Sequence, residues 1–139
     1  AGIRAHDRGV YVNMEGPAFS TRAESMRNQK MGFDVIGMTN LGEARCAREA
    51  EISYAALALV TDYDCWKVEE EPVSVETVIA CVQKNVQAAK QIIRKAISHI
   101  PAKPNWPSHR ALENAIMTPK SAWPSDTVEK LTPIIGRFL

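Results

Sequence analysis

The sequence has no excess of charge of either sign and no long apolar run. Its 139 residues include 17 Lys and Arg against 16 Asp and Glu, a formal net charge of +1. Without surplus cations there is no electrostatic basis for nucleic acid or an anionic membrane surface as a partner. The longest apolar run, at residues 54–60, is much shorter than the roughly 18 residues that a membrane-spanning helix needs. Because no basic region followed by an apolar core indicates a secretory signal, we expect a cytoplasmic protein.

Cysteine and histidine are too few and too scattered to indicate a metal site. The cysteines are Cys46, Cys65 and Cys81, and the histidines are His6, His99 and His109. An odd number of cysteines without a C-x-x-C pair predicts neither a disulfide framework nor a zinc site, so buried, apolar-like thiols are the better interpretation. No two histidines lie four residues apart, as the ligands of a helical metal site would.

The composition is that of a globular protein. Hydrophobic residues make up 45% and charged residues 24% of the sequence, which is typical of folded domains and not of disordered chains. The length suits one domain. The sequence begins Ala1-Gly2-Ile3-Arg4 without an initiating methionine, so we expect either a processed start or a part of a longer chain.

The apolar pattern predicts strands that alternate with helices, which is typical of an α/β fold. Residues 9–14 alternate with a period of two, and residues 33–39 are expected to form a second strand. The near-continuous apolar run at 52–61 predicts a strand buried on both faces.

The helices are indicated by caps and by apolar periodicity. Thr21 and Glu24 have the spacing of a capping box. Ser74 is an N-cap candidate for the most secure helix, whose apolar residues recur at three- and four-residue spacing. The expected helices are 21–31, 41–51, 75–100, 108–117 and 125–139, the last interrupted at Pro133.

Two polar stretches follow the first two predicted strands, where ligands of α/β sheets usually bind. In residues 14–20, Gly16 and Pro17 shape a turn, and Phe19 either packs into the core or stacks on a flat ligand. In residues 37–40, Thr39 either caps the next helix or binds an anion with nearby backbone amides.

Two acidic stretches follow the apolar run. Asp62 and Asp64, within residues 61–66, are either solvated loop acids or partners of a heterocycle, and a site can raise the pKa of such a carboxyl. The run Glu69-Glu70-Glu71 is interpreted as a solvated face without a catalytic role.

Three of these stretches, taken in order, resemble a known family. They read E-G-P-A-F-S-T-R-A-E-S (15–25), D-V-I-G-M-T-N (34–40) and T-D-Y-D-C-W (61–66). They resemble the 5'-methylthioadenosine phosphorylases, a family of the trimeric purine nucleoside phosphorylase superfamily, from about Gly9 to Val86 and more weakly to the C-terminus. The resemblance implies an α/β fold with a mixed central sheet flanked by helices. Residues 1–139 would then be the C-terminal part of a single nucleoside phosphorylase domain.

The resemblance also implies a reaction. The family cleaves the N-glycosidic bond of methylthioadenosine with inorganic phosphate, giving adenine and 5-methylthioribose 1-phosphate. Asp62 matches the catalytic carboxylate near purine N7, and Asp64 matches the carboxylate near the 6-amino group. A protonated Asp62 that donates to N7 would neutralise the charge that builds on the leaving purine. Phosphate is a co-substrate, and neither a metal nor an organic cofactor is expected.

Further site residues are implied in the same way. Phe19 would flank the base and Met38 would lie against the ribose, while Val75, Val78 and Ile79 would line the alkylthio pocket. The substrate-binding residues besides the two aspartates are Phe19, Ile36, Met38, Tyr63, Val78 and Ile79. The phosphate-binding residue is Thr39, and the residues associated with substrate preference are Ser20 and Val75.

Asp62 separates this family from relatives that act on 6-oxopurines. Those relatives carry Asn at this position, because an amide suits O6 and N7 whereas a carboxylate suits a 6-amino donor. An apolar wall at Val75 and Val78 suits a methylthio group, since a 5'-hydroxyl would lose a hydrogen bond there at a cost of about 1–3 kcal/mol. A phosphorylase with a 6-oxopurine or broader preference, and a non-catalytic nucleoside-binding fragment, remain alternatives.

The sequence departs from the family in having no Gly-rich phosphate loop, since its seven glycines are spread from Gly2 to Gly136. In the family this loop, an Arg-His pair and a further Thr come from an earlier region of the chain. The resemblance therefore implies the N-terminal part of the enzyme as a partner, with this chain supplying the base pocket and part of the ribose and phosphate site. It also implies a homo-oligomer, either a trimer or a dimer of trimers.

Overall fold

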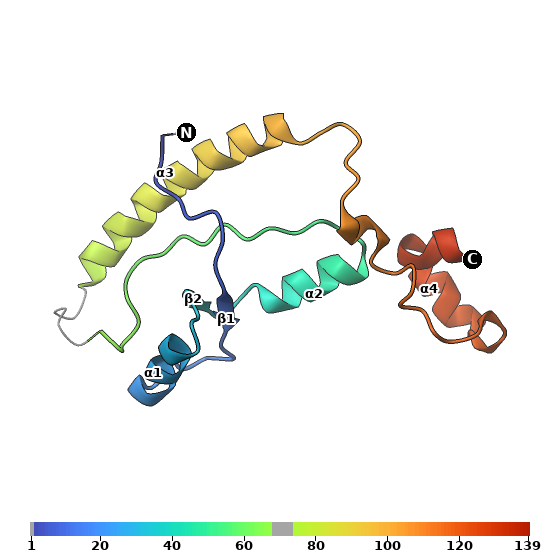
Figure 1. Ribbon diagram of the computed structural model, residues 1–139, viewed down its shortest axis with the longest axis horizontal. Coiled ribbons are helices and arrows are strands. Elements are labelled where there is room, and N and C mark those ends of the chain that lie inside the picture. Colours follow the sequence, from blue (N-terminus) through green and yellow to red (C-terminus); the bar gives the residue numbers. More distant parts are fainter. Residues whose placement is uncertain (1, 68–73) are drawn as a thin grey trace. The chain divides into compact units, whose positions relative to one another are not determined.

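The computed structural model describes residues 2–67 and 74–139 (Figure 1). The chain forms two compact units. The first unit comprises Ala1–Asn40 and Ala56–Ala102, and the second comprises Leu41–Ala55 and Lys103–Leu139. The acidic run at residues 69–71 lies outside the described residues.

A β-α-β segment begins the first unit. Strand β1 (Tyr11–Asn13) lies parallel to β2 (Val35–Gly37), with Val12 opposite Ile36. Helix α1 (Arg22–Lys30) connects the two strands. The predicted strands are confirmed with shorter bounds, and this parallel pair is the only sheet in the described part of the chain. The expectation of an α/β fold is therefore confirmed, although the mixed sheet is represented here by two parallel strands.

The capping box at the start of α1 is confirmed. The Thr21 hydroxyl accepts from the Glu24 amide at 3.3 Å, and the Glu24 carboxylate accepts from the Thr21 amide at 2.8 Å. Both bonds satisfy amides that the first turn of a helix leaves without partners. The helix has little apolar surface, and its buried residues are the polar Ser25 and Asn28.

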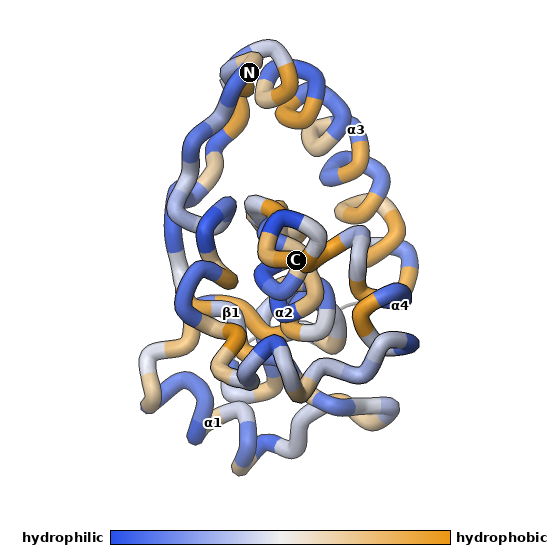
Figure 2. Tube along the Cα trace, turned by 90° about the vertical axis from the view of Figure 1, so that its right-hand side faces the viewer, coloured by the Kyte–Doolittle hydropathy of each residue, from blue (hydrophilic) through white to orange (hydrophobic). Residues whose placement is uncertain are grey.

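Helix α3 (Val75–His99) completes the first unit and confirms the predicted long helix. The Ser74 hydroxyl caps it by accepting from the Thr77 amide at 3.2 Å. Apolar and polar residues alternate along the helix (Figure 2), as its spacing predicted. Ala89 is the only buried apolar residue among those that the structure describes, so most of the apolar face of α3 is exposed.

The predicted strand at 52–61 is wrong, because the described residues of this segment form no strand. Leu57 and Leu59 are 42% and 41% exposed, and Val60 is 58% exposed. Apolar composition alone does not make a strand, because a strand also needs a neighbour for its backbone hydrogen bonds. Neither β1 nor β2 pairs with it.

The second unit begins with helix α2 (Leu41–Glu49), which confirms the predicted short helix. After it the Ile52 amide donates to the Ala47 carbonyl at 2.8 Å and the Glu51 amide to the Arg48 carbonyl at 3.1 Å. This is the bonding pattern of a Schellman cap, in which glycine is usual at the left-handed position. Here Glu51 has that conformation, with φ 56°.

The C-terminal part of the second unit consists of short turns and one α-helix. The predicted helix at 108–117 is wrong: a 3₁₀ helix, η1 (Pro107–Arg110), is followed by turns with bonds between residues three apart. So short an apolar segment gains too little from packing to hold a regular α-helix. Two further 3₁₀ helices are η2 (Lys120–Ala122) and η3 (Gly136–Phe138).

Helix α4 (Ser125–Ile135) runs through Pro133, so the predicted interruption there is wrong. A proline so close to the end of a helix removes a single backbone hydrogen bond, and the carbonyl that is freed belongs to exposed Glu129. The Thr132 hydroxyl reinforces the same turn by donating to the Val128 carbonyl at 2.8 Å.

The cysteines are less buried than expected. Cys46 and Cys65 are exposed and Cys81 is half-buried, so the prediction of buried thiols is wrong for the first two, because the unit to which each belongs leaves it accessible. Residues 2–67 and 74–139 contain no cluster of three or more His, Cys, Asp or Glu that could hold a metal ion. No helix in these ranges is both long enough and apolar enough to cross a membrane.

Candidate functional site

All the residues that the sequence analysis implicates lie in the first unit. They come from the turn after β1, the turn after β2, the loop at Thr61–Trp66 and the start of α3. We call Thr61–Trp66 the acidic loop.

The turn after β1 is built around Gly16. Its φ is 71°, in the left-handed region, and a Cβ at this position would lie 3.1 Å from the Met38 sulfur. Glycine is therefore required both by the backbone and by the approach of Met38. The turn presents Phe19 with 84% of its side chain exposed, so the interpretation that Phe19 packs into the core of this unit is wrong. Ser20 follows it and is half-buried.

The turn after β2 continues the sheet and holds the main chain of Met38. The Met14 amide donates to the Gly37 carbonyl at 2.8 Å, which extends the parallel ladder by one bond. The Asn13 side-chain amide donates to the Met38 carbonyl at 3.3 Å. The two turns thus meet at Met38, and Thr39 is exposed directly after it.

The side chains of Asp62 and Asp64 in the acidic loop accept hydrogen bonds from adjacent residues. The Thr61 hydroxyl donates to Asp62 Oδ1 at 2.5 Å, and the Cys65 amide donates to Asp64 Oδ1 at 2.9 Å. Asp62 is exposed and Asp64 is half-buried. Each carboxylate keeps an oxygen that these bonds do not use, so both can bind a polar group of a ligand.

Aromatic and cationic groups surround the end of the acidic loop. The rings of Tyr63 and Trp66 meet edge to face with centroids 5.8 Å apart. The Lys67 ammonium lies 3.7 Å from the centre of the Tyr63 ring. These contacts hold the Tyr63 ring only in part, because Tyr63 is still 58% exposed.

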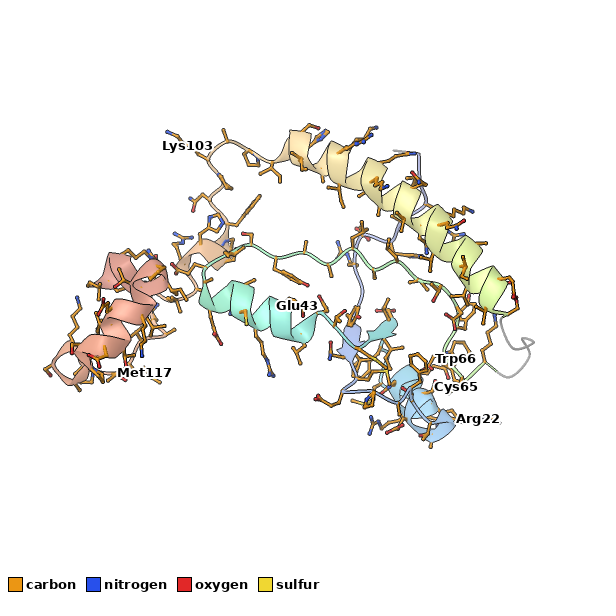
Figure 3. The ribbon with its side chains drawn as sticks, turned by 180° about the vertical axis from the view of Figure 1, so that it is seen from behind. Arg22, Glu43, Cys65, Trp66, Lys103 and Met117 are labelled. Atoms are coloured by element: carbon orange, nitrogen blue, oxygen red, sulfur yellow. The ribbon has the colours of Figure 1, made fainter. Side chains whose placement is uncertain are left out.

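Contacts with α1 bring the acidic loop to the turn after β1. The Cys65 thiol donates to the Ser20 carbonyl at 3.5 Å, and the Trp66 amide donates to Ser25 Oγ at 3.1 Å. Figure 3 shows Cys65 and Trp66 beside α1, where Arg22 is labelled. The structure therefore joins Ser20 and the acidic loop, which lie more than 40 residues apart in the sequence.

Helix α3 contacts the other end of the acidic loop. The Asn85 side chain donates to the Val60 carbonyl at 2.8 Å, and the Cys81 thiol lies 3.8 Å from the same oxygen. The first turns of the helix carry Val78, which is half-buried, and Val75 and Ile79, which are 69% and 52% exposed. These apolar side chains are available to a ligand or to another part of the protein.

Both helices that border the site begin with an acid whose charge is stabilised. Hydrogen bonds from the Thr21 amide and hydroxyl hold the pKa of Glu24 below its ordinary value. The pKa of Glu76 is lowered by hydrogen bonds from its own amide and from Ser74. The carboxylates also face the positive ends of the helix dipoles, which favours the ionised form.

Sequence reasoning missed three residues that hold the site together, namely Asn13, Ser25 and Asn85. Asn13 is the last residue of β1. A polar residue next to Val12 is what the alternating pattern of a strand predicts, so nothing in the sequence singled it out. Ser25 gave no signal in the sequence, because α1 has no apolar stripe that would mark an inward face. Asn85 carried a signal that could have been used, because it stands three residues after Val82, where the apolar period of α3 predicts an apolar residue.

A family model, sequence relatives and solved structures that match this chain are all phosphorylases. A model of the phosphorylase superfamily matches residues 1–98. The chain is 52% identical over 138 residues to the S-methyl-5'-thioadenosine phosphorylase of Synechocystis sp., covering 99% of this chain and 42% of that protein. It is 51% identical over 139 residues to the enzyme of the same name from Geobacter sulfurreducens, covering 100% and 49%. The chain thus spans less than half of the length of these relatives.

Solved structures agree with the sequence matches. A methylthioadenosine phosphorylase sourced from an Antarctic soil metagenomic library superposes with a TM-score of 0.84 and 45% identity, over 91% of this chain and 45% of that chain. The Schistosoma mansoni methylthioadenosine phosphorylase in complex with adenine gives a TM-score of 0.62 and 45% identity, over 69% and 34%.

Proposed function

The chain belongs to the phosphorylase superfamily, and from this premise we propose that it carries part of the active site of a 5'-methylthioadenosine phosphorylase. The reaction is phosphorolysis of methylthioadenosine to adenine and 5-methylthioribose 1-phosphate. The observation that carries the proposal is the joining, within one unit, of the turns after β1 and β2 and the acidic loop, through Ser20–Cys65, Ser25–Trp66 and Gly16–Met38. A relative solved in complex with adenine supports the same substrate class.

The acidic loop is proposed to bind the purine. Asp64 accepts from the 6-amino group, and Asp62, in its protonated form, donates to N7. When the bond between C1' and N9 breaks, its electron pair moves into the purine, and the proton from Asp62 neutralises that charge. Such general-acid assistance contributes typically about 10²–10⁴-fold to the rate. Phe19, which is exposed and precedes the Ser20 carbonyl that contacts this loop, flanks the base together with Tyr63.

The sugar and phosphate are proposed to lie toward the turn after β2. Met38 and Ile36 contact the ribose, and Thr39 binds the phosphate whose oxygen forms the new bond to C1'. Holding phosphate and sugar in line can supply on the order of 7–11 kcal/mol of the barrier. Val75, Val78 and Ile79 form the apolar seat of the alkylthio group, with Ser20 and Val75 setting preference at the two ends of the substrate.

The proposal needs no metal or organic cofactor, because protonation and positioning account for the chemistry. Phosphate enters as a co-substrate. We further propose that the remaining phosphate ligands come from an N-terminal part of the enzyme, since the relatives are more than twice as long as the matched region. A cytoplasmic homo-oligomer, as a trimer or a dimer of trimers, and a place in purine and methionine salvage belong to the same proposal.

Replacement of the Asp62 carboxyl by an amide tests the proposal. In the full-length enzyme, phosphate-dependent adenine release from methylthioadenosine should exceed hypoxanthine release from inosine. Asp62→Asn should lower adenine release from methylthioadenosine, because an amide cannot protonate N7. The ratio of hypoxanthine release to adenine release should rise, because an amide suits a 6-oxopurine.

The matched control is Asp126→Asn, the same chemical change on exposed α4 in the second unit, which should leave the ratio of the two activities unchanged. Adenine binding without phosphorolysis would favour a non-catalytic nucleoside-binding module instead. A preference of the wild type for inosine would favour a 6-oxopurine phosphorylase.

A further inference from the structure

The placement of the two carboxylates depends on the ends of the acidic loop. Inside the loop the side-chain bonds join neighbours only, Thr61 to Asp62 and Asp64 to Cys65. Bonds between adjacent residues fix local geometry but cannot fix the position of the loop relative to the purine site. That position must be set by contacts with residues distant in the sequence.

One such contact is made by Ser25 on α1. Its side chain is fully buried, with 0% exposed, although it is polar. Its Oγ accepts from the Trp66 amide at 3.1 Å. A buried hydroxyl that accepts from a backbone amide 41 residues away satisfies both groups, and removal of either would leave the other without a partner.

The second contact is made by Asn85 on α3. Its side-chain amide donates to the Val60 carbonyl at 2.8 Å, directly before the acidic loop begins. Asn85 is half-buried and lies between Val82 and Val86 on the helix, where the apolar pattern alone would not place an amide. Its side chain thus replaces a strand neighbour for the carbonyl of Val60.

We propose that Ser25 and Asn85 are positioning residues that hold the acidic loop at its two ends and so place Asp62 and Asp64 against the purine. Neither touches the reacting atoms. Ser25 lies in α1, which begins shortly after Phe19 and Ser20, so the same contact also sets the distance between the loop and the segment that carries Phe19. This inference rests on the proposed function for the identity of the ligand, but the contacts themselves can be tested without it.

The test compares two ligands in the full-length enzyme. Adenine has a 6-amino group for Asp64, whereas unsubstituted purine lacks it. In Ser25→Ala and Asn85→Leu, we expect the ratio of the purine Kd to the adenine Kd to fall at least about fivefold toward unity, and kcat/KM for methylthioadenosine to fall roughly 10- to 100-fold. Partial unfolding would weaken both ligands equally and leave the ratio unchanged, so an unchanged ratio overturns the inference.

Two further variants complete the comparison. Ser25→Thr keeps the hydroxyl acceptor and should retain the discrimination. Ser98→Ala is the matched control, because Ser98 is also on α3 but its hydroxyl donates to the Lys95 carbonyl of the same helix at 2.7 Å. It should leave the ratio unchanged, and a fall of the same size in this control would overturn the inference.

Hydrogen exchange separates failure of the inference from failure of the proposed function. The Trp66 amide should exchange faster in Ser25→Ala than in the wild type, while amides of β1 and β2 keep their rates. Unchanged exchange at Trp66 would overturn the role of Ser25 whatever the ligand. If the wild type binds no adenine, the proposed function falls, whereas faster exchange at Trp66 would still support Ser25 as the residue that holds the loop.

Discussion

Among single residues, Glu51 combines an unfavourable backbone conformation with a strong side-chain contact. Its φ of 56° is one that glycine adopts more readily. Its carboxylate accepts from Arg137 at 2.6 Å and from the Leu112 amide at 3.0 Å, and its side chain is 12% exposed. The contacts with the C-terminal part of the second unit therefore compensate for the conformation and explain why glutamate can occupy this cap.

The same carboxylate makes the stability of the second unit dependent on pH. Hydrogen bonds from Arg137 and from the Leu112 amide hold the pKa of Glu51 below its ordinary value of 4.5. Because the folded pKa is the lower one, the stabilisation is present above the unfolded pKa and is lost as the pH falls through the folded pKa. We expect the melting temperature to decrease on acidification below about pH 4.5, and to decrease less in Glu51→Gln.

Calorimetry across this acidic range measures the effect. Glu129→Gln, on the exposed surface of α4, is the control and should follow the wild type. An identical pH dependence in the wild type and in Glu51→Gln would contradict the assignment of the pKa shift to this ion pair.

At the candidate site, the close approach of Gly16 and Met38 shows why a sequence motif can predict a turn but not the contacts that the turn makes. Glycine before proline already predicted a turn, and φ of 71° agrees with it. The sequence could not show that the space beside Gly16 is occupied by a side chain 22 positions further along, at 3.1 Å from the site of a Cβ. Such contacts follow from tertiary packing, which residue spacing does not encode.

Among the elements, α1 is the helix whose start depends most on one side chain. The Thr21 hydroxyl and the Glu24 carboxylate satisfy each other's backbone amides, and little apolar surface supports the helix. We expect Thr21→Ala to lower the free energy of unfolding by about 1 kcal/mol and to weaken adenine binding, because the start of α1 follows Phe19 and Ser20.

Urea unfolding and adenine titration measure these two effects together. Thr127→Ala, inside α4 and away from any cap contact of α1, is the control. Equal loss of stability in both variants would show that the capping box contributes nothing beyond the loss of a threonine side chain.

The elements that could be predicted are those with local causes. The capping box of α1, the Ser74 cap and the apolar period of α3 depend on residues within one or two turns, and all three are present. The strand at 52–61 and the helix at 108–117 were wrong because they depend on neighbours distant in the sequence. At the candidate site, the roles of the motif residues stay a prediction, and the contacts of Ser25 and Asn85 could be seen only in the fold.

At the scale of the whole molecule, the described residues include almost no fully buried apolar side chain. Ala89 is the one buried apolar residue among them. The large apolar residues of α3 with at least a third of their surface exposed are Val75, Ile79, Val82, Val86, Ile93 and Ile97. Hydrophobic burial is the main favourable contribution to folding, so these faces must gain cover for the site to be rigid.

We therefore expect the 139-residue chain by itself to release no adenine from methylthioadenosine in the presence of phosphate. Thr39 is the single phosphate ligand proposed here, and the exposed apolar faces leave the acidic loop on a weakly packed support. Adenine release, measured with and without phosphate, tests this, with the full-length enzyme as the positive control. Robust phosphate-dependent turnover by the chain alone would contradict the expectation.

The β-α-β segment has a consequence for the order in which the site is assembled. Tyr11 pairs with Val35 across a connection of 23 residues, and α1 carries its own cap within that span. Closing so short a loop loses little chain entropy, and contacts between near neighbours form early in folding. We therefore expect the hydroxyl of Ser25 to be in place before the acidic loop arrives from 41 residues away, so that α1 serves as a template for the last segment of this unit to fold.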